Sequence, residues 1–181
     1  MDNEEIKRDD KQSPIPEAGI LGVILGKFSD LFAVMIWAAA IILVIEVFLR
    51  YVFNAPTIWG HETVVFLTAC SSMFGGLLVA PRDRHIRVVI IYDYLPPKAK
   101  RVLNVIISFL CFLSTLFFTW AVWIAVNRAI FTPQGDFRVE RSGTAFNAPY
   151  PGLLRVFLFV VMILLTLQFL TLTINYFRKK D

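Results

Sequence analysis

The amino-acid sequence predicts an all-α integral membrane protein with four transmembrane helices, short interfacial amphipathic segments, and cytoplasmic N- and C-termini. The first observation behind this fold class is composition. Of the 181 residues, 57% are hydrophobic and 18% are charged, whereas a typical soluble domain is about 45–50% apolar and about 25% charged. The second observation is distribution, because the charges cluster at the chain ends and in one connection and leave long uncharged stretches between them. Lipid is therefore the expected solvent for most of the chain.

Four of these stretches are long enough to cross a bilayer, whose core of roughly 30 Å requires about 20 apolar helical residues. We expect spans over about residues 31–53, 63–80, 102–131 and 153–177. The chain then divides into a polar N-terminal tail (1–19), a single four-helix membrane domain (20–177) and a basic C-terminal tail (178–181). The acidic, mixed N-terminus lacks the basic n-region of a secretory signal peptide, so we expect the first span to remain in the mature protein.

The distribution of Lys and Arg predicts the orientation. Thirteen of the 18 Lys and Arg residues lie before the first span, between the second and third spans, or after the fourth. Cytoplasmic loops carry the Lys and Arg excess, so both termini and the central connection are expected in the cytoplasm. The net charge of +4 is then explained by basic cytoplasmic loops, and we expect a lipid bilayer as partner and no nucleic acid.

Two short segments outside the spans are expected to lie at the membrane interface. Before the first span, apolar residues recur at helical spacing, which predicts an amphipathic helix; they are Ile20, Ile24, Phe28 and Leu31, flanked by Leu21, Leu25 and Phe32. In this segment Gly22 and Gly26 form a GxxxG pair that either marks close helix contact or arises by chance. The second segment, residues 84–95, is too short to span the bilayer and carries two tyrosines suited to headgroup depth.

The third span begins far from the membrane core. Pro97 suits the first turn of a helix, and the 35 residues from there to Phe131 would extend about 52 Å. This helix must therefore tilt strongly or project from the membrane. The connection that follows, residues 132–152, is rich in Gly, Pro and polar residues and is expected to be a loop.

The chain offers little for catalysis, and we expect neither enzymatic activity nor a cofactor or metal. Its two histidines, His61 and His85, are 24 residues apart, about 36 Å along a helix, and cannot ligate one haem or metal. The sequence from Gly22 to Phe28 resembles a phosphate-binding loop but is one residue short and lacks its Ser or Thr. The serines in the spans have no histidine at the same depth to activate them.

The spans also lack the pattern of a translocation path. Only Gly75-Gly76 interrupts a span, without the matching break expected of a secondary transporter, and Gln168 is more easily explained by a bond to a neighbouring helix. Glu46, Arg50, Glu62 and Arg128 gather near the outer membrane edge. Charges in spans usually pair, so we expect Arg50 to pair with Glu62 across the first hairpin, with Trp59 covering the pair. Glu46, four residues before Arg50, is the competing partner.

Short motifs in this order resemble a known family. Arg50–Glu62 reads RYVFNAPTIWGHE and is followed by Phe74-Gly75-Gly76 and Arg84-His85-Ile86. Together with the Pro149–Pro151 entry to the fourth span, these resemble the small membrane subunit (Q-type) of tripartite ATP-independent periplasmic (TRAP) transporters over about residues 32–177. An acidic residue that the family often has after His-Ile is absent here, where the chain reads Arg87-Val88-Val89.

The resemblance implies a function that the spans alone do not. Such a subunit, in the bacterial inner membrane, would scaffold a large ion-coupled permease subunit and help dock a periplasmic binding protein that captures an organic acid. The candidate residues for structure or subunit contact are Glu46, Arg50, Trp59, Glu62, Gly75, Gly76 and His85. The alternative is a structural or assembly subunit, a membrane anchor without haem, of another inner-membrane complex.

Overall fold

A computed structural model describes residues 18–80 and 96–178. The described chain forms helices α2 (Gly19–Lys27), α3 (Ser29–Tyr51), α4 (Gly60–Val79), α6 (Pro97–Ile130) and α7 (Tyr150–Arg178). Four helices are long and apolar enough to cross a membrane, with α2 and α3 counted as one from Gly19 to Tyr51. The fold class predicted from the sequence is therefore confirmed. The bilayer side of the termini stays a prediction, as does the division into a polar tail, a membrane domain and a basic tail.

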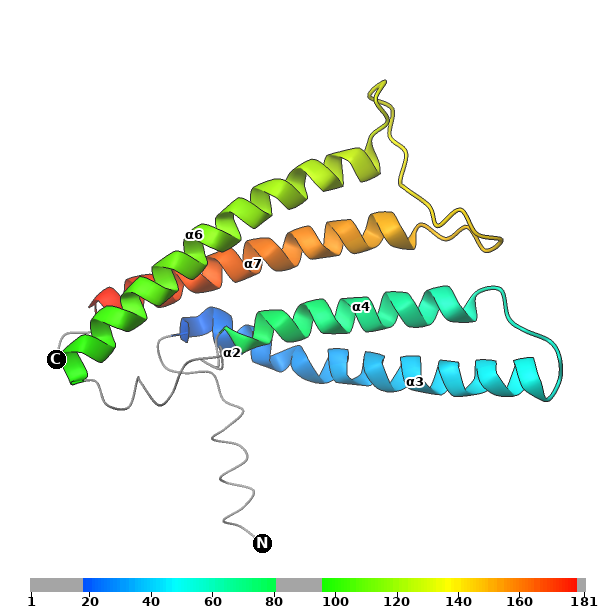
Figure 1. Ribbon diagram of the computed structural model, residues 1–181, viewed down its shortest axis with the longest axis horizontal. Coiled ribbons are helices and arrows are strands. Elements are labelled where there is room, and N and C mark those ends of the chain that lie inside the picture. Colours follow the sequence, from blue (N-terminus) through cyan, green and yellow to red (C-terminus); the bar gives the residue numbers. More distant parts are fainter. Residues whose placement is uncertain (1–17, 81–95, 179–181) are drawn as a thin grey trace, which may run out of the picture.

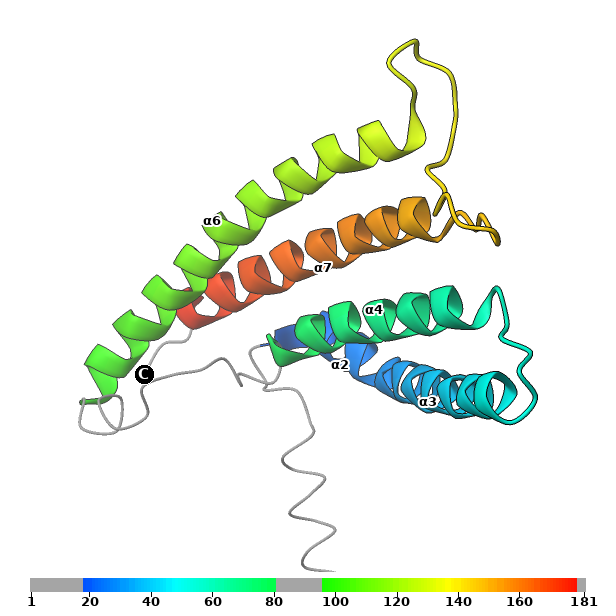
Figure 2. The ribbon, with the colours of Figure 1, turned by 45° about the vertical axis from the view of Figure 1, so that its right-hand side comes forward.

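The four spans lie side by side in the order α6, α7, α4, α3, in a row (Figures 1 and 2). Helices α3 and α4 form one antiparallel hairpin and α6 and α7 another, and the two hairpins meet where α4 packs on α7. The connections 52–59 and 131–149 lie at the same end of the row (Figure 1), which we call the loop end. Only 11–28% of the residues in the most apolar window of each span are buried within the chain, and many large apolar side chains are open to lipid or to a partner.

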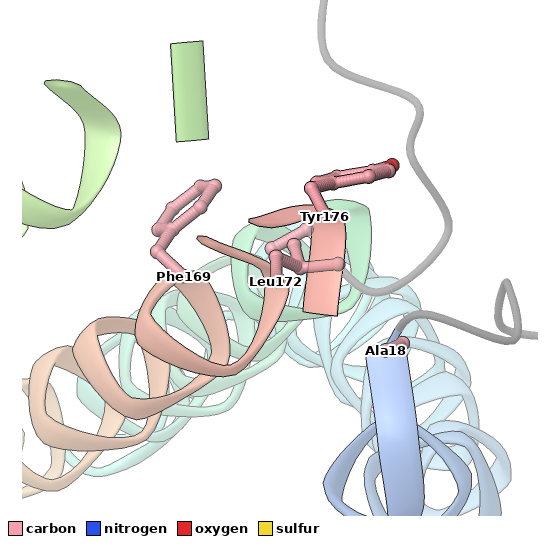
Figure 3. Close-up of a cluster of buried hydrophobic side chains, with 5 residues drawn as sticks. Ala18, Phe169, Leu172 and Tyr176 are labelled. Carbon is pink, nitrogen blue, oxygen red and sulfur yellow. The ribbon is translucent and has the colours of Figure 1, made fainter. Parts of the chain in front are cut away.

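The hydrophobic core lies toward the end opposite the loop end. One cluster joins Ala18 and Ala80 to three side chains on consecutive turns of α7, namely Phe169, Leu172 and Tyr176 (Figure 3). A second cluster joins Leu25 of α2 to Phe74 and Leu77 of α4 and to Val161 of α7. Helix α2 is thus packed into the junction of the two hairpins.

The position of α2 corrects one detail of the sequence interpretation. A helix forms before the first span as predicted, but the stripe read from the sequence points outward, with Ile20 81%, Ile24 46% and Phe28 51% exposed. The flanking residues pack inward instead, since Leu25 is buried and Phe32 stacks on Phe74 with ring centroids 3.9 Å apart. A Cβ on Gly26 would meet nothing within 4 Å, so this glycine makes no close helix contact within the described chain.

Hydroxyl and amide side chains join the helices through hydrogen bonds. Ser71 of α4 donates to the Phe32 carbonyl at 3.1 Å, and the hydroxyls of Thr119 and Thr166 lie 3.0 Å apart between α6 and α7. Gln168 is fully buried, and its Nε2 donates to the Ala18 carbonyl at 3.1 Å, which ties α7 to the start of α2. In hydrocarbon each unmade bond would cost free energy, so these contacts fix the helix pairings.

Two further expectations meet the structure at the second and third spans. Helix α6 begins at Pro97 and has 34 residues, about 51 Å at 1.5 Å per residue, as the sequence predicts. Helix α4 runs unbroken from Gly60 to Val79, so the expectation that Gly75-Gly76 interrupts this span is wrong. Glycine lowers helix stability without breaking the backbone bonds. The segment 84–95, with His85, lies outside the described residues.

Candidate functional site

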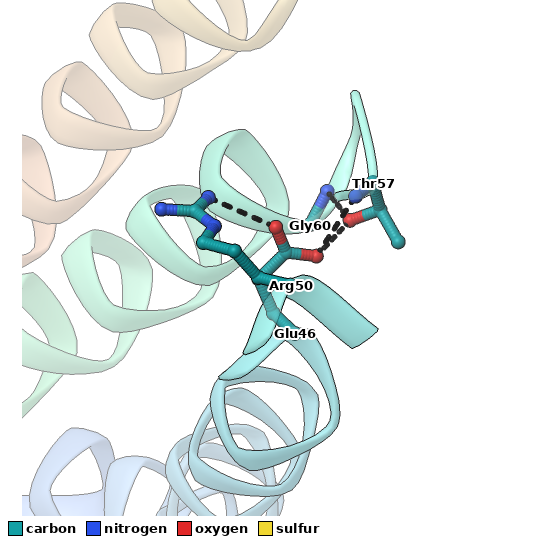
Figure 4. Close-up of polar contacts among 4 residues, drawn as sticks. All are labelled: Glu46, Arg50, Thr57 and Gly60. Carbon is teal, nitrogen blue, oxygen red and sulfur yellow. Dashed lines mark hydrogen bonds and ion pairs between the residues drawn. The ribbon is translucent and has the colours of Figure 1, made fainter. Parts of the chain in front are cut away.

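Glu46 organises the turn between α3 and α4. The residue is 5% exposed at the loop end of α3, and one carboxylate oxygen accepts a bond from Arg50 Nη2 at 3.0 Å. The other oxygen accepts from the Thr57 backbone N–H at 3.2 Å and from the Thr57 hydroxyl. Figure 4 shows the carboxylate between the guanidinium and the connection. Three donors on one carboxylate offset the cost of burying its charge.

The predicted pairing of Arg50 with Glu62 is therefore wrong, and the competing partner Glu46 is the one that Arg50 binds. Residues four apart on a helix face one another, whereas Glu62 faces the other hairpin. Trp59 is 46% exposed and lies at the N-cap of α4, where its carbonyl accepts from Thr63 Oγ1.

Gly60 completes the Glu46 turn, and the sequence interpretation missed it. Its N–H donates to Thr57 Oγ1 at 3.1 Å. A Cβ at this position would lie 2.5 Å from Thr57 Oγ1 and 3.0 Å from Glu46 Oε2, so only glycine leaves room for the bonds. The spacing Thr57-x-x-Gly60 just before an apolar run resembles a helix N-terminus and is the signal that could have pointed to it.

Glu62 joins the two hairpins at the loop end. One carboxylate oxygen accepts from the Thr144 hydroxyl of the long connection. The other is buried and has no hydrogen-bond partner among the described residues. Nearby, Phe66 of α4 stacks on Tyr150 of α7 with ring centroids 4.6 Å apart, and the Thr63 and Tyr150 hydroxyls lie 3.3 Å apart. A pocket of about 240 Å³ opens beside Glu62; it is lined by His61, Glu62, Val65, Phe66, Ser142, Tyr150, Pro151 and Leu154.

The connection 131–149 is a folded loop, held by backbone hydrogen bonds within itself and to the ends of α6 and α7 and by one ion pair. Phe131 and Phe137 form an isolated antiparallel bridge, and the N–H of Glu140 donates to the Ala129 carbonyl at 2.7 Å. Arg155 of α7 forms an ion pair with Glu140, with Nη2 3.1 Å from Oε1. A Cβ on Gly152 would lie 2.6 Å from Val139 Cγ1, so a glycine is needed where α7 begins beneath the loop. None of these contacts was predicted, because they join residues that only the folded connection brings together.

Three arginines line a recess of about 420 Å³ beneath this connection. They are Arg128 in the last turn of α6 and Arg138 and Arg141 in the loop, and all three side chains are exposed. Arg128 was predicted to lie near Glu46, Arg50 and Glu62 at one membrane edge. The structure places all four at the loop end, but it puts Arg128 in this recess, apart from the Glu46 turn.

The exposed face of α4 is unusual for a span that faces lipid. Its exposed residues recur at helical spacing and most are small or polar; they are His61, Val65, Thr68, Ser72, Gly75 and Gly76. A Cβ on either glycine would meet nothing within 4 Å. The mean hydropathy of the most apolar window of α4 is 1.6, against 2.2–2.7 for the other spans. Small residues on a span allow another helix to approach closely.

Within residues 18–80 and 96–178, no group of three or more His, Cys, Asp and Glu side chains is placed to hold a metal ion. His61 lies at the pocket beside Glu62, and His85 falls outside the described part of the chain. The described residues form two connections held by hydrogen bonds, a recess lined by arginines, and an exposed face of small residues on α4. These features suit binding and assembly.

A protein-family model with the description "Tripartite ATP-independent periplasmic transporters, DctQ component" matches residues 39–178. The match begins within α3 and includes α4, α6, α7 and both connections of the loop end. No curated protein is similar enough in sequence to match the chain.

Proposed function

Because the chain belongs to the DctQ component family of the TRAP transporters, we propose that it scaffolds the large ion-coupled permease subunit in a bacterial inner membrane. We further propose that it helps dock a periplasmic binding protein during import of an organic acid. The observation that carries the proposal is the match of this transporter-subunit family to a chain whose four spans form an open row. A row with so little of each span buried leaves a broad apolar surface for a larger membrane partner.

The exposed face of α4 supports contact with the large subunit. Helix association in lipid depends on close packing and on hydrogen bonds between helices, and this face offers both. Gly75 and Gly76 leave space beside the backbone, while Thr68 and Ser72 present hydroxyls outward. We therefore assign Gly75 and Gly76 to the subunit contact, a role that was expected from the sequence.

The loop end supports contact with the binding protein, provided that it faces the periplasm as the Lys and Arg distribution predicts. Both connections there are held by side-chain and backbone bonds, so a partner meets a surface that is already ordered. We assign Glu46 and Arg50 the role of fixing the conformation of the first connection. We assign Trp59 and Glu62 to the surface that contacts the binding protein. For His85 the resemblance is the only support for a role.

Reconstitution tests this function. Liposomes containing a large TRAP permease subunit that copurifies with this chain, with its binding protein and an ion gradient, should take up the organic acid only when this chain is present. This chain alone should give no more uptake than empty liposomes. Equal uptake with and without the chain would overturn the scaffold role, and uptake by the lone chain would reveal a translocation path within it.

A matched pair of substitutions tests the α4 contact within the same system. Gly75→Leu adds bulk to the face of α4 and should lower the yield of complex with the large subunit at least several-fold. Ala40→Leu adds similar bulk to an exposed position of α3 and should leave the yield unchanged. If Ala40→Leu lowers the yield and Gly75→Leu does not, the large subunit contacts α3 and not the exposed face of α4.

A further inference from the structure

The arginine recess carries positive charge that the described chain does not neutralise. Arg128 and Arg138 form no ion pair with any residue that the structure describes, and the Arg141 guanidinium donates to the Asn147 carbonyl at 3.1 Å. Glu140 is the one acidic side chain in the lining, and it is engaged by Arg155. Three arginine side chains around one recess concentrate positive charge there, which favours an anion.

The recess is also held in shape before any ligand arrives. The N–H of Arg138 donates to the Ile130 carbonyl at 2.7 Å, which fixes the first arginine of the loop against the end of α6. The N–H of Ser142 donates to the Ala148 carbonyl at 3.0 Å, and the left-handed φ values of 69° at Gly143 and 50° at Asn147 close the turn between them. Because the backbone is fixed, binding an anion would order little more than the three arginine side chains.

We propose that this recess is a binding site for a small organic anion with two or more carboxylate groups. Guanidinium groups bind carboxylates through two parallel hydrogen bonds, and three of them around one recess match a di- or tricarboxylate better than a single carboxylate. The volume of about 420 Å³ falls within the roughly 300–1,000 Å³ of pockets that take small molecules. This proposal does not depend on the scaffold and docking roles.

Calorimetry on the purified full-length chain in a neutral detergent tests the site directly. Citrate and succinate are the probes, the uncharged dimethyl ester of succinate is the negative control, and inorganic phosphate tests for a general anion site. We expect saturable binding of citrate, weaker binding of succinate, no binding of the ester, and affinity that falls as sodium chloride is raised. Absence of saturable citrate binding at low salt would overturn the proposal, as would phosphate binding as tight as citrate.

Substitutions locate the binding. The double change Arg138→Gln and Arg141→Gln should weaken citrate binding at least tenfold. Arg178→Gln removes one positive charge from the exposed far end of α7 and should leave the affinity within twofold. The conservative change Arg138→Lys and Arg141→Lys keeps the charge and the fold but loses the paired hydrogen bonds, so it should also weaken binding several-fold. Equal losses in the double Gln variant and Arg178→Gln would show attraction by net charge alone and overturn the site.

Two other sources of anionic groups give distinguishable results. If acidic lipid fills the recess, phosphatidylglycerol in nanodiscs should abolish citrate binding to the unmodified chain, and the lipid assignment would replace ours. If the recess instead takes acidic side chains of the binding protein, the double Gln variant should lose retention of that protein while the unmodified chain binds no citrate. Citrate binding that persists in phosphatidylglycerol nanodiscs and is lost in the double Gln variant supports the proposal.

Discussion

At the scale of single residues, Glu46 has the most consequential placement in the described chain. It lies in the last turns of a span, where an unpaired charge is costly, yet it is buried to 5% exposure. The cost is offset because Arg50 comes from the same helix and Thr57 returns from the connection to supply two more donors. The Glu46 carboxylate therefore fixes the conformation of the 52–59 connection.

This arrangement predicts that Glu46→Gln destabilises the fold more than Glu62→Gln does. Glutamine keeps the shape of the side chain but weakens the charge-assisted bonds, and its NH₂ group would meet the donors of Thr57. We expect a loss of about 1–3 kcal/mol in unfolding free energy at Glu46 and a smaller loss at Glu62, which accepts one bond within the described chain. Thermal unfolding followed by circular dichroism in detergent measures both losses. A larger loss at Glu62 would contradict the role of Glu46 in fixing the 52–59 connection.

Two glycines provide a sharper test at this scale. In Gly60→Ala the new Cβ would lie 2.5 Å from Thr57 Oγ1, so the Glu46 turn must shift, and we expect a lower midpoint of thermal unfolding. In Gly75→Ala the new Cβ meets nothing within 4 Å, and replacing a mid-helix glycine by alanine stabilises by roughly 0.5–1 kcal/mol. The isolated chain should therefore respond in opposite directions to the two substitutions. A Gly60→Ala protein as stable as the unmodified chain would show that the turn tolerates a side chain.

The sequence was enough to predict which charged residues lie near the loop end, but not which of them form an ion pair. Glu46, Arg50 and Glu62 could all be placed near one membrane edge from hydropathy alone. Glu62 nevertheless faces Thr144 and the other hairpin, because α4 packs between α3 and α7. Which neighbour a helix face meets depends on the order of helices in the row, and that order is not encoded in the spacing of residues along one helix.

At the scale of elements, helix α2 is held by polar contacts and by apolar packing. Gln168 of α7 donates to the carbonyl of Ala18, and Leu25 enters the core cluster with Phe74 and Leu77. The remaining face of α2 is apolar and exposed. Hydropathy and Pro97 were enough to predict the long helices, but both faces of α2 are apolar, so periodicity could not indicate which one packs inward.

We predict that Gln168→Leu loosens α2 while the four spans persist. Leucine has a similar size but no donor, so the carbonyl of Ala18 would be left without this bond in a buried site, at a cost of about 1–3 kcal/mol. Hydrogen exchange should rise over residues 19–27 and change little in α6. Thr173→Val is the matched control, because the Thr173 hydroxyl bonds only its own helix, to the Phe169 carbonyl, among the contacts described. Equal exchange in the two variants would show that apolar packing alone holds α2.

At the scale of the whole molecule, the open row explains why one short chain can serve a larger assembly. Four helices arranged as a compact bundle would bury most of their apolar surface against one another, and here only 11–28% of the residues in the most apolar window of each span are buried. The loop end of the row is polar. Glu62, Trp59 and the arginine recess lie there, beside the connections 52–59 and 131–149. A partner in the membrane and a partner in solution can therefore bind different parts of the chain at once.

Which partner can bind the polar end depends on the side of the membrane that this end faces. Thirteen of the 18 Lys and Arg residues come before the first span, between the second and third spans, or after the fourth. The loop end holds the other two connections, so it should face the periplasm. After Cys70→Ala and Cys111→Ala, single cysteines introduced by Asn3→Cys and Lys180→Cys should react with an impermeant maleimide only in opened cells. A cysteine introduced by Gln134→Cys, in the exposed long connection, should react in intact spheroplasts. Labelling of Asn3→Cys from outside would place the arginine recess and the Glu46 turn in the cytoplasm, where a periplasmic binding protein could not reach them.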